Sequence, residues 1–128
     1  MVQSPILGEL EIKVMEHLWI HREGTVKSVH EHLSSTKKLS TNTIQSALER
    51  LFRKELLVRS KQSHSYIYSV KVSKEELLGS MITDMLGRFG TDSQLSTAAI
   101  INAAESIDDD ALNMLGAEIE RRRKVGES

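Results

Sequence analysis

The stretch LSTNTIQSALERLFRKELL, residues 39–57, is amphipathic at helical spacing. Its apolar side chains recur at i, i+3, i+4, i+7 and i+8, which is the pattern of a helix that buries one face. Ser40 precedes them, and its hydroxyl can accept a hydrogen bond from a backbone N–H of the first turn. We therefore predict a helix that begins after Ser40. The residues that would hold it are Ile44, Ala47, Leu48, Leu51 and Phe52.

The opposite face of this predicted helix is sorted by side-chain length. At about 100° per residue, Asn42, Ser46 and Glu49 point away from the apolar face. Amide side chains can pair with adenine, and short hydroxyls can contact bases in the major groove of DNA. Because Ser, Thr and Asn are poor helix formers, their concentration here favours a function. The predicted base-reading residues are Thr41, Asn42, Thr43, Gln45 and Ser46.

Basic residues follow at the end of the same helix, where we expect it to leave the groove and approach phosphates. Arg50, Arg53 and Lys54 are therefore predicted to contact the DNA backbone. Glu49 is negatively charged and would repel a neighbouring phosphate. It either pairs with Arg53 at i+4, which is a favourable order, or accepts a hydrogen bond from a cytosine amino group.

Two shorter amphipathic segments precede this helix, residues 7–20 and residues 25–35, and Gly24 breaks the pattern between them. Thr25 is a suitable N-cap for the second segment. That segment and the helix after Ser40 are joined by a few residues, and the second helix is the longer one. This arrangement matches the helix-turn-helix motif.

The period changes after Leu57, where apolar and polar residues alternate. Val58–Lys61 and Ser65–Val70 are predicted to be the two strands of a hairpin. A helix-turn-helix followed at once by a hairpin is a winged helix, so the fold class is mainly α with a small β-hairpin. Arg59, Lys61 and His64 would place donors at or near the wing tip, and Tyr66 either covers the edge of the core or bonds a phosphate. The predicted backbone contacts outside the helix are Lys37, Lys38, Lys61, His64 and Tyr66.

Residues 1–72 are thus expected to form a DNA-binding domain and residues 73–128 a helical dimerisation domain. Ser73 and Glu76 match a capping box. The apolar stripes that follow are too few for a good core of their own. They either fold back on the first domain or pack on a second copy of the chain, and we predict the homodimer, the commonest soluble oligomer. The predicted dimerisation residues are Leu77, Leu78, Met81, Ile82, Met85, Leu86, Phe89, Leu112, Leu115 and Ile119.

Charge is distributed unevenly along the 128 residues, although the net charge is only −1. Residues 21–74 hold 11 Lys and Arg against 4 Asp and Glu, a local net charge of +7, whereas the remainder carries −8. A basic segment of this kind is what phosphate binding requires. The sequence lacks cysteine, a membrane-length apolar run and a signal-peptide pattern, so we expect a cytoplasmic protein that is not inserted in a membrane.

Catalytic and metal sites find little support in the sequence. No nucleophile with a base, phosphate loop or carboxylate pair is recognisable, so we predict no enzyme and no cofactor. His17 and His21 have the i, i+4 spacing that can chelate a metal, but His30 and His32 fall on opposite faces of their helix. We therefore predict no metal site. A metal-responsive regulator that uses these histidines and a winged helix that binds other proteins remain the alternative functions.

LGELEIKVMEHLW (residues 7–19), VKSVHEHL (residues 26–33) and the stretch from Leu39 to Ser69 occur in an order and spacing that resembles the penicillinase and methicillinase repressor family of winged helices. The resemblance implies a homodimeric transcriptional repressor. Its winged helices would bind a palindromic operator in double-stranded DNA, with bases read at positions that match Asn42, Thr43, Gln45 and Ser46. A membrane sensor protease or another inducer system would be a further partner.

Two departures from the family pattern bear on regulation. The copper-responsive branch carries a C-terminal cysteine cluster, which this chain lacks. The β-lactam branch is induced by proteolysis in the dimerisation region, at an Asn-Phe bond in staphylococcal members. The comparable stretch here, AAIINAAES at residues 98–106, lacks that pair, so the sequence does not predict cleavage there.

Overall fold

A computed structural model describes residues 7–35, 38–90 and 92–127. The chain divides into two compact units, Met1–Asp84 and Met85–Ser128, which are described separately below. The helix α4 (Lys74–Arg88) begins in the first unit and ends in the second. None of the described helices is both long and apolar enough to cross a membrane.

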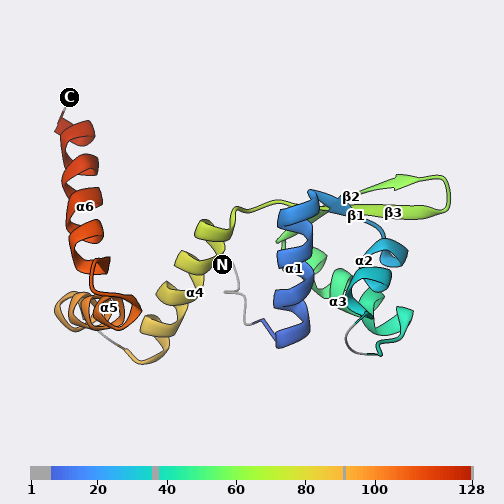
Figure 1. Ribbon diagram of the computed structural model, residues 1–128, viewed down its shortest axis with the longest axis horizontal. Coiled ribbons are helices and arrows are strands. Elements are labelled where there is room, and N and C mark those ends of the chain that lie inside the picture. Colours follow the sequence, from blue (N-terminus) through green and yellow to red (C-terminus); the bar gives the residue numbers. More distant parts are fainter. Residues whose placement is uncertain (1–6, 36–37, 91, 128) are drawn as a thin grey trace. The chain divides into compact units, whose positions relative to one another are not determined.

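The described residues of the first unit form three helices, three strands and the beginning of α4, and Figure 1 labels these elements. In chain order its elements are α1 (Glu9–His21), β1 (Glu23–Gly24), α2 (Val26–Leu33), α3 (Thr41–Arg53), β2 (Leu57–Gln62) and β3 (Ser65–Val70). Helices α2 and α3 form the predicted helix-turn-helix, and β2 and β3 form the predicted hairpin. The winged-helix fold class is confirmed.

Three predicted caps start helices where the sequence indicated. The Thr25 hydroxyl accepts from Ser28 N, and the Ser40 hydroxyl accepts from Thr43 N, each over 3.1 Å. At α4, Glu76 N donates to the Ser73 hydroxyl while Ser73 N donates to the Glu76 carboxylate, again at 3.1 Å each. These bonds satisfy backbone groups that the helix itself leaves without partners.

The sheet has a third strand that the sequence did not reveal. Its antiparallel order is β1-β3-β2, with Gly24 opposite Tyr68 and with Leu57 opposite Val70. Gly24 was interpreted as a break, whereas it also passes tightly over the core: an added Cβ would lie 3.0 Å from Cγ2 of Val29. A side chain at Gly24 would therefore force β1 away from its place.

The core of the first unit lies between the helices and the sheet. It combines apolar faces of α1, α2 and α3 with side chains from β2, β3 and α4 and with Leu56 just before β2, and burial of each large apolar side chain contributes about 1.5–3 kcal/mol. The Trp19 indole donates to Val72 O over 2.9 Å, which ties α1 to the segment before α4. The core side chains are Val14, Met15, Leu18, Val29, Ile44, Ala47, Leu48, Leu51, Leu56, Leu57, Tyr68 and Leu77.

Two ionisable side chains on α1, Glu11 and His17, are buried beside this core. Glu11 is paired with Arg50 of α3 and with Lys54 just after it, whereas His17 Nδ1 is buried without a hydrogen-bond partner. Burial, followed by the nearby rings of His21 and His32, lowers the pKa of His17. The uncharged imidazole is therefore the favoured form in the folded protein.

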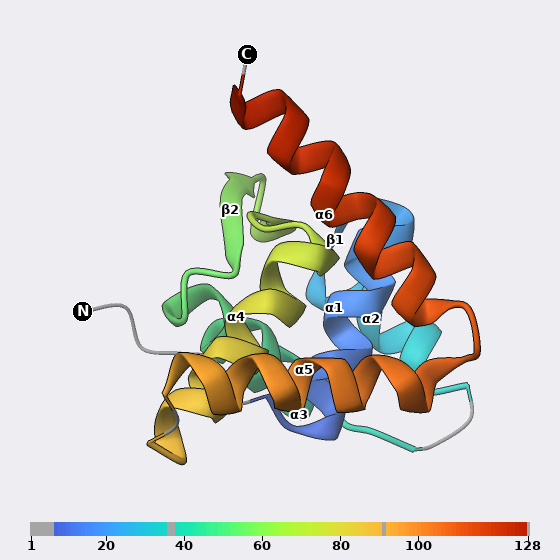
Figure 2. The same cartoon turned by 90° about the vertical axis from the view of Figure 1, so that its left-hand side faces the viewer.

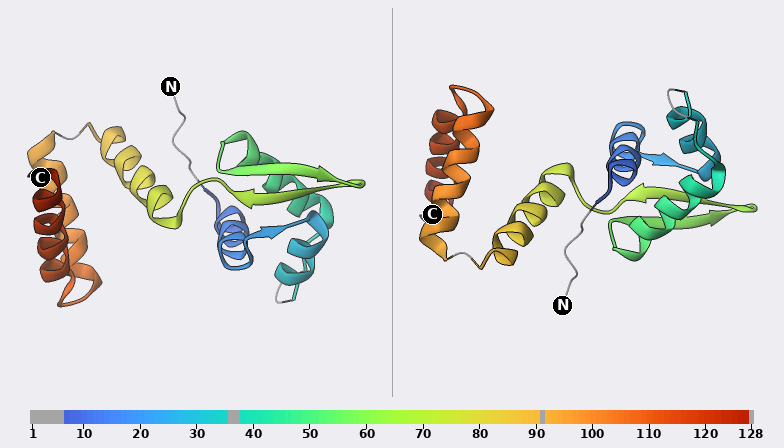
Figure 3. Two further views of the ribbon diagram at one scale, coloured as in Figure 1. Left: turned by 90° about the horizontal axis from the view of Figure 1, so that it is seen from above. Right: turned by 90° about the horizontal axis from the view of Figure 1, so that it is seen from below.

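The second unit consists of the end of α4 with α5 (Ser93–Ile107) and α6 (Ala111–Glu127), which lie against each other (Figures 2 and 3). Asp92 caps α5 by accepting from Leu95 N over 2.8 Å. The small apolar stretch at residues 95–104 forms the middle of this helix. Among the described side chains of this unit, the buried apolar set consists of Ala104 alone.

Candidate nucleic-acid interface

The outer face of α3 is open to solvent, and the predicted base-reading residues on it, Thr41, Asn42, Thr43, Gln45 and Ser46, are all exposed. A shallow hollow runs along this face from its short polar end to its basic end. The hollow is lined by Asn42, Gln45, Ser46, Glu49, Arg50 and Arg53. The structure thus brings polar side chains and guanidinium groups together on one continuous surface.

A second hollow joins the start of α3 to the wing. Thr41 and Gln45 of α3 line it together with His64 and Tyr66, so the wing lies beside the recognition-helix candidate. Its wall also includes Lys27, in the first turn of α2. Lys27 was absent from the sequence-based set, although its place in the basic segment after the Thr25 cap was a signal that could have suggested it.

Thr43 is only partly free for a ligand. Its hydroxyl and that of Ser40 lie 2.8 Å apart and share a hydrogen bond, while Thr43 N donates to Ser40. The Thr43 hydroxyl is therefore already engaged in one hydrogen bond, with the N-cap residue Ser40. The hydroxyl retains further bonding capacity, and the methyl group remains available for an apolar contact such as a thymine methyl.

Glu49 is neutralised by two guanidinium groups. Its Oε2 accepts from Arg59 Nη1 over 2.7 Å, and its Oε1 lies 3.7 Å from Arg53 Nε. The predicted i+4 pair with Arg53 is confirmed, and the shorter contact comes from β2. With its charge compensated, Glu49 no longer opposes a phosphate strand as an isolated carboxylate would.

Arg59 was expected at or near the wing tip, but its guanidinium is packed against α3 instead. It stacks over the ring of Phe52 at 3.9 Å and that of Tyr66 at 4.2 Å, contacts that attract a cation. The hydrogen bond with Tyr68, followed by that with Glu49, raises the pKa of Arg59. Arg59 therefore fixes the base of the wing to α3.

Arg50 and Lys54, predicted as phosphate contacts, are held by the buried carboxylate of Glu11. Lys54 Nζ lies 2.9 Å from Glu11 Oε2, and Arg50 Nε lies 3.7 Å from Oε1. Half of the Arg50 side chain stays exposed, whereas Lys54 is mostly covered. Lys54 consequently links α1 to the end of α3 and is the less accessible of the two.

The remaining predicted phosphate contacts lie around this surface. Lys38, Lys61, His64 and Tyr66 are exposed, with His64 in the turn between β2 and β3. Lys37 lies outside the described residues. Exposed cations on the wing and before α3 therefore flank the polar end of the recognition-helix candidate.

The sequence model of the penicillinase repressor family matches residues 7–121, which is most of the chain. The chain belongs to the penicillinase repressor family. Members of this family are transcriptional repressors and not enzymes, so the predictions of a DNA-binding repressor and of no catalysis are confirmed.

Individual relatives agree with this family. The chain is 34% identical over 118 residues to the transcriptional regulator BlaI of Mycobacterium tuberculosis, covering 89% of this chain and 85% of that one. It is 28% identical over 89 residues to the penicillinase repressor of Bacillus licheniformis, covering 70% of each. The solution structure of the DNA-binding domain of the repressor BlaI matches with a TM-score of 0.53 and 29% identity, covering 59% of this chain and 93% of that one.

The side chains predicted to form the dimer interface fall into two groups, one buried in or packed on the core and one exposed or half-buried. Leu77 is buried in the core of the first unit, and Met81 packs against that core. Leu78, Ile82, Met85, Phe89, Leu112 and Ile119 are exposed, and Leu86 and Leu115 are half-buried. The exposed fraction reaches 61% for Met85 and 81% for Phe89, so the apolar surface available to a partner begins after the first turn of α4.

Proposed function

We propose that the protein represses transcription as a homodimer on a palindromic operator, with α3 of each protomer in the major groove. The observation that carries this proposal is the exposed outer face of α3, polar at its N-terminal end and basic at its C-terminal end. A recognition helix contacts base edges with its N-terminal residues. The short side chains of Thr41, Asn42 and Ser46 would let the backbone approach the bases closely.

The wing and the start of α2 would add contacts with the DNA backbone. Lys27 and His64 are exposed donors in the hollow at the start of α3, and Lys61 is exposed on β2 opposite Tyr66. Such contacts set the position of the protein on DNA without selecting its sequence. Their contribution should weaken as the salt concentration rises, since binding to phosphates releases counterions.

The exposed apolar side chains of α4, α5 and α6 support the homodimer. Large apolar side chains that stay exposed on helices favour association, and a second copy of the chain offers the same helices as a partner. Two-fold symmetry would place the recognition helices on half-sites about 34–36 Å apart, one helical turn of DNA, or a multiple of it.

We also propose a location in the cell and an inducing partner for this repressor. A repressor must meet the DNA that it regulates, so we place the protein in the cytoplasm. A membrane sensor protease is the inducing partner that the family resemblance suggests. Residues 98–106, the comparable site of cleavage, lie within α5 and lack the Asn-Phe pair, so we do not propose cleavage at that place.

Band shifts with a two-fold repeat from the protein's own promoter and with random DNA of equal length test the proposal. Asn42→Ala should lose about 1–3 kcal/mol on the repeat and little on random DNA. Lys61→Ala, the matched control, should weaken both alike and flatten the salt dependence. If the repeat binds no better than random DNA, the repressor proposal fails in favour of a protein-interaction module.

A further inference from the structure

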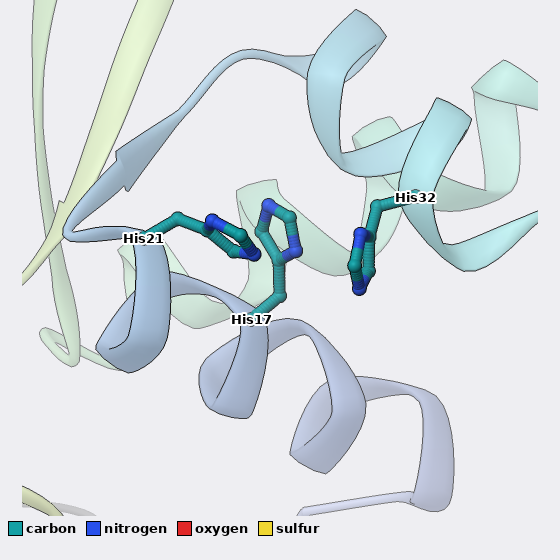
Figure 4. A group of neighbouring side chains, drawn as sticks. All are labelled: His17, His21 and His32. Carbon is teal, nitrogen blue, oxygen red and sulfur yellow. The ribbon is translucent and has the colours of Figure 1, made fainter.

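Three histidine rings from two helices meet on the side of α1 that faces α2. His17 and His21 are one turn apart on α1, and His32 belongs to the last turn of α2 (Figure 4). The ring of His17 lies 4.3 Å from that of His21 and 4.6 Å from that of His32, centroid to centroid. The helical spacing indicated the first pair, but His32 joins it only through the packing of α2 on α1.

The nitrogen atoms of this histidine cluster (His17, His21 and His32) are close enough to share an ion. One ring nitrogen from each residue lies within 4.8 Å of the other two. A tetrahedral ion with bonds of about 2.0–2.1 Å would separate them by about 3.4 Å. His21 and His32 are exposed, so rotation of their side chains can close the remaining gap without moving a helix.

His17 is the fixed member of the cluster. Its side chain is only 7% exposed, and its Nδ1 has no hydrogen-bond partner. Buried polar atoms without partners are rare and call for an explanation. His30, by contrast, is already occupied, since its Nε2 bonds the carbonyl of Leu39 at 2.6 Å.

We propose that His17, His21 and His32 bind one divalent first-row transition-metal ion of the Zn²⁺ or Cu²⁺ class. Three neutral imidazoles suit these ions, whereas Mg²⁺ and Ca²⁺ require oxygen ligands. A water molecule would complete four-fold coordination, as in other three-histidine zinc sites. His32 also lines a surface hollow with Lys13 and Leu33, which gives the ion a path from solvent.

A bound ion would connect α1 to α2, and α2 packs directly on α3. The cluster would therefore stabilise the helix-turn-helix from behind, because none of its members lines the outer face of α3. This site is independent of the proposed operator binding: loss of metal binding and loss of DNA binding would be separate results.

Titration calorimetry with ZnCl₂, and separately with CuCl₂, tests the site on the full chain without a histidine tag. We expect one ion per protomer, with the stoichiometry checked by native mass spectrometry. His21→Ala and His32→Ala remove exposed ligands without disturbing the core, and each should weaken binding by at least about tenfold, because even the loss of an outer-shell partner costs 10–100-fold. His64→Ala, which removes an exposed histidine from the wing, should leave the affinity unchanged.

Thermal unfolding provides a second measurement. An ion that binds only the folded chain raises Tm, by roughly 10 °C at a hundredfold excess over Kd, and His32→Ala should abolish most of this rise. Tetrahedral Co²⁺ should give intense visible absorption bands in the native chain that His32→Ala removes. The proposal is overturned if the native chain binds neither ion, if His32→Ala binds as tightly as the native chain, or if His64→Ala causes the same loss.

Discussion

Residues 7–84 and residues 85–127 both carry regularly spaced apolar side chains, but the two segments place them in opposite environments. The first unit buries its stripes between helices and sheet, as with Ile44 and Leu48 of α3. In the second unit, Met85, Phe89 and Ile107 remain mostly exposed. Equal periodicity therefore predicts helices in both units, whereas burial shows which of them has a core of its own.

This difference suggests how the two units divide the work. The core, the Glu11 pairs and the Arg59 stack all hold α3 rigidly from behind, as its proposed role in reading DNA would require. Helices without a core of their own gain stability by association. The DNA-binding part would then be stable within one protomer, and the C-terminal helices only within a dimer.

Leu48→Ala should cause the largest loss, because it removes a fully buried side chain from the first core. We expect the free energy of unfolding to fall by about 3–5 kcal/mol, measured by urea denaturation. Ile20→Ala, at an exposed position of α1, should change it by less than about 0.5 kcal/mol. Similar losses in both variants would mean that the first unit is not the rigid one.

Met85→Asp should act on association and leave the fold of the first unit intact. An unpaired carboxylate in an apolar interface is costly, and we expect the dimer to weaken by about 2–3 kcal/mol, as determined by sedimentation velocity. Asn113→Asp adds the same charge at an exposed polar position of α6 and serves as the control. Dimers of unchanged stability for Met85→Asp would refute the role assigned to the exposed face.

Glu49→Gln should have a smaller effect, on DNA rather than on the fold. Removing this carboxylate frees the Arg53 and Arg59 charges, so affinity for random DNA should rise by no more than about tenfold and the salt slope should steepen by up to about 0.9. Filter binding at several salt concentrations measures both. Glu31→Gln, which removes an exposed charge from α2, should leave the slope unaltered; equal changes would contradict a specific role for Glu49.

Glu118 should produce the smallest effect, and only in the second unit. Hydrogen bonds from Arg121 and then Arg122 lower its pKa from 4.5 to about 2. Because the folded-state pKa is depressed, the stabilisation is present above pH 4.5 and is lost as the pH falls through about 2. The Tm difference between the native chain and Glu118→Gln should shrink over that window in circular dichroism; a difference that is constant with pH would exclude this pairing.

The sequence by itself determined the features that depend on interactions within a turn of helix or between adjacent residues. The caps at Thr25, Ser40 and Ser73, the buried face of α3 and the alternation of β3 all follow from spacings of two to four residues. Such interactions form wherever the local chain adopts its preferred conformation, so residue order is sufficient to predict them. The polar start and the basic end of α3 were likewise predictable from residue order alone.

Only the tertiary structure decided the contacts between elements that are distant in sequence. Strand β1 has two residues and exists because β3 pairs with it. Arg59 of β2 neutralises Glu49 of α3, and His32 of α2 joins His17 and His21 of α1. No local spacing encodes these contacts, since each depends on the angle and register at which two elements pack around the shared core.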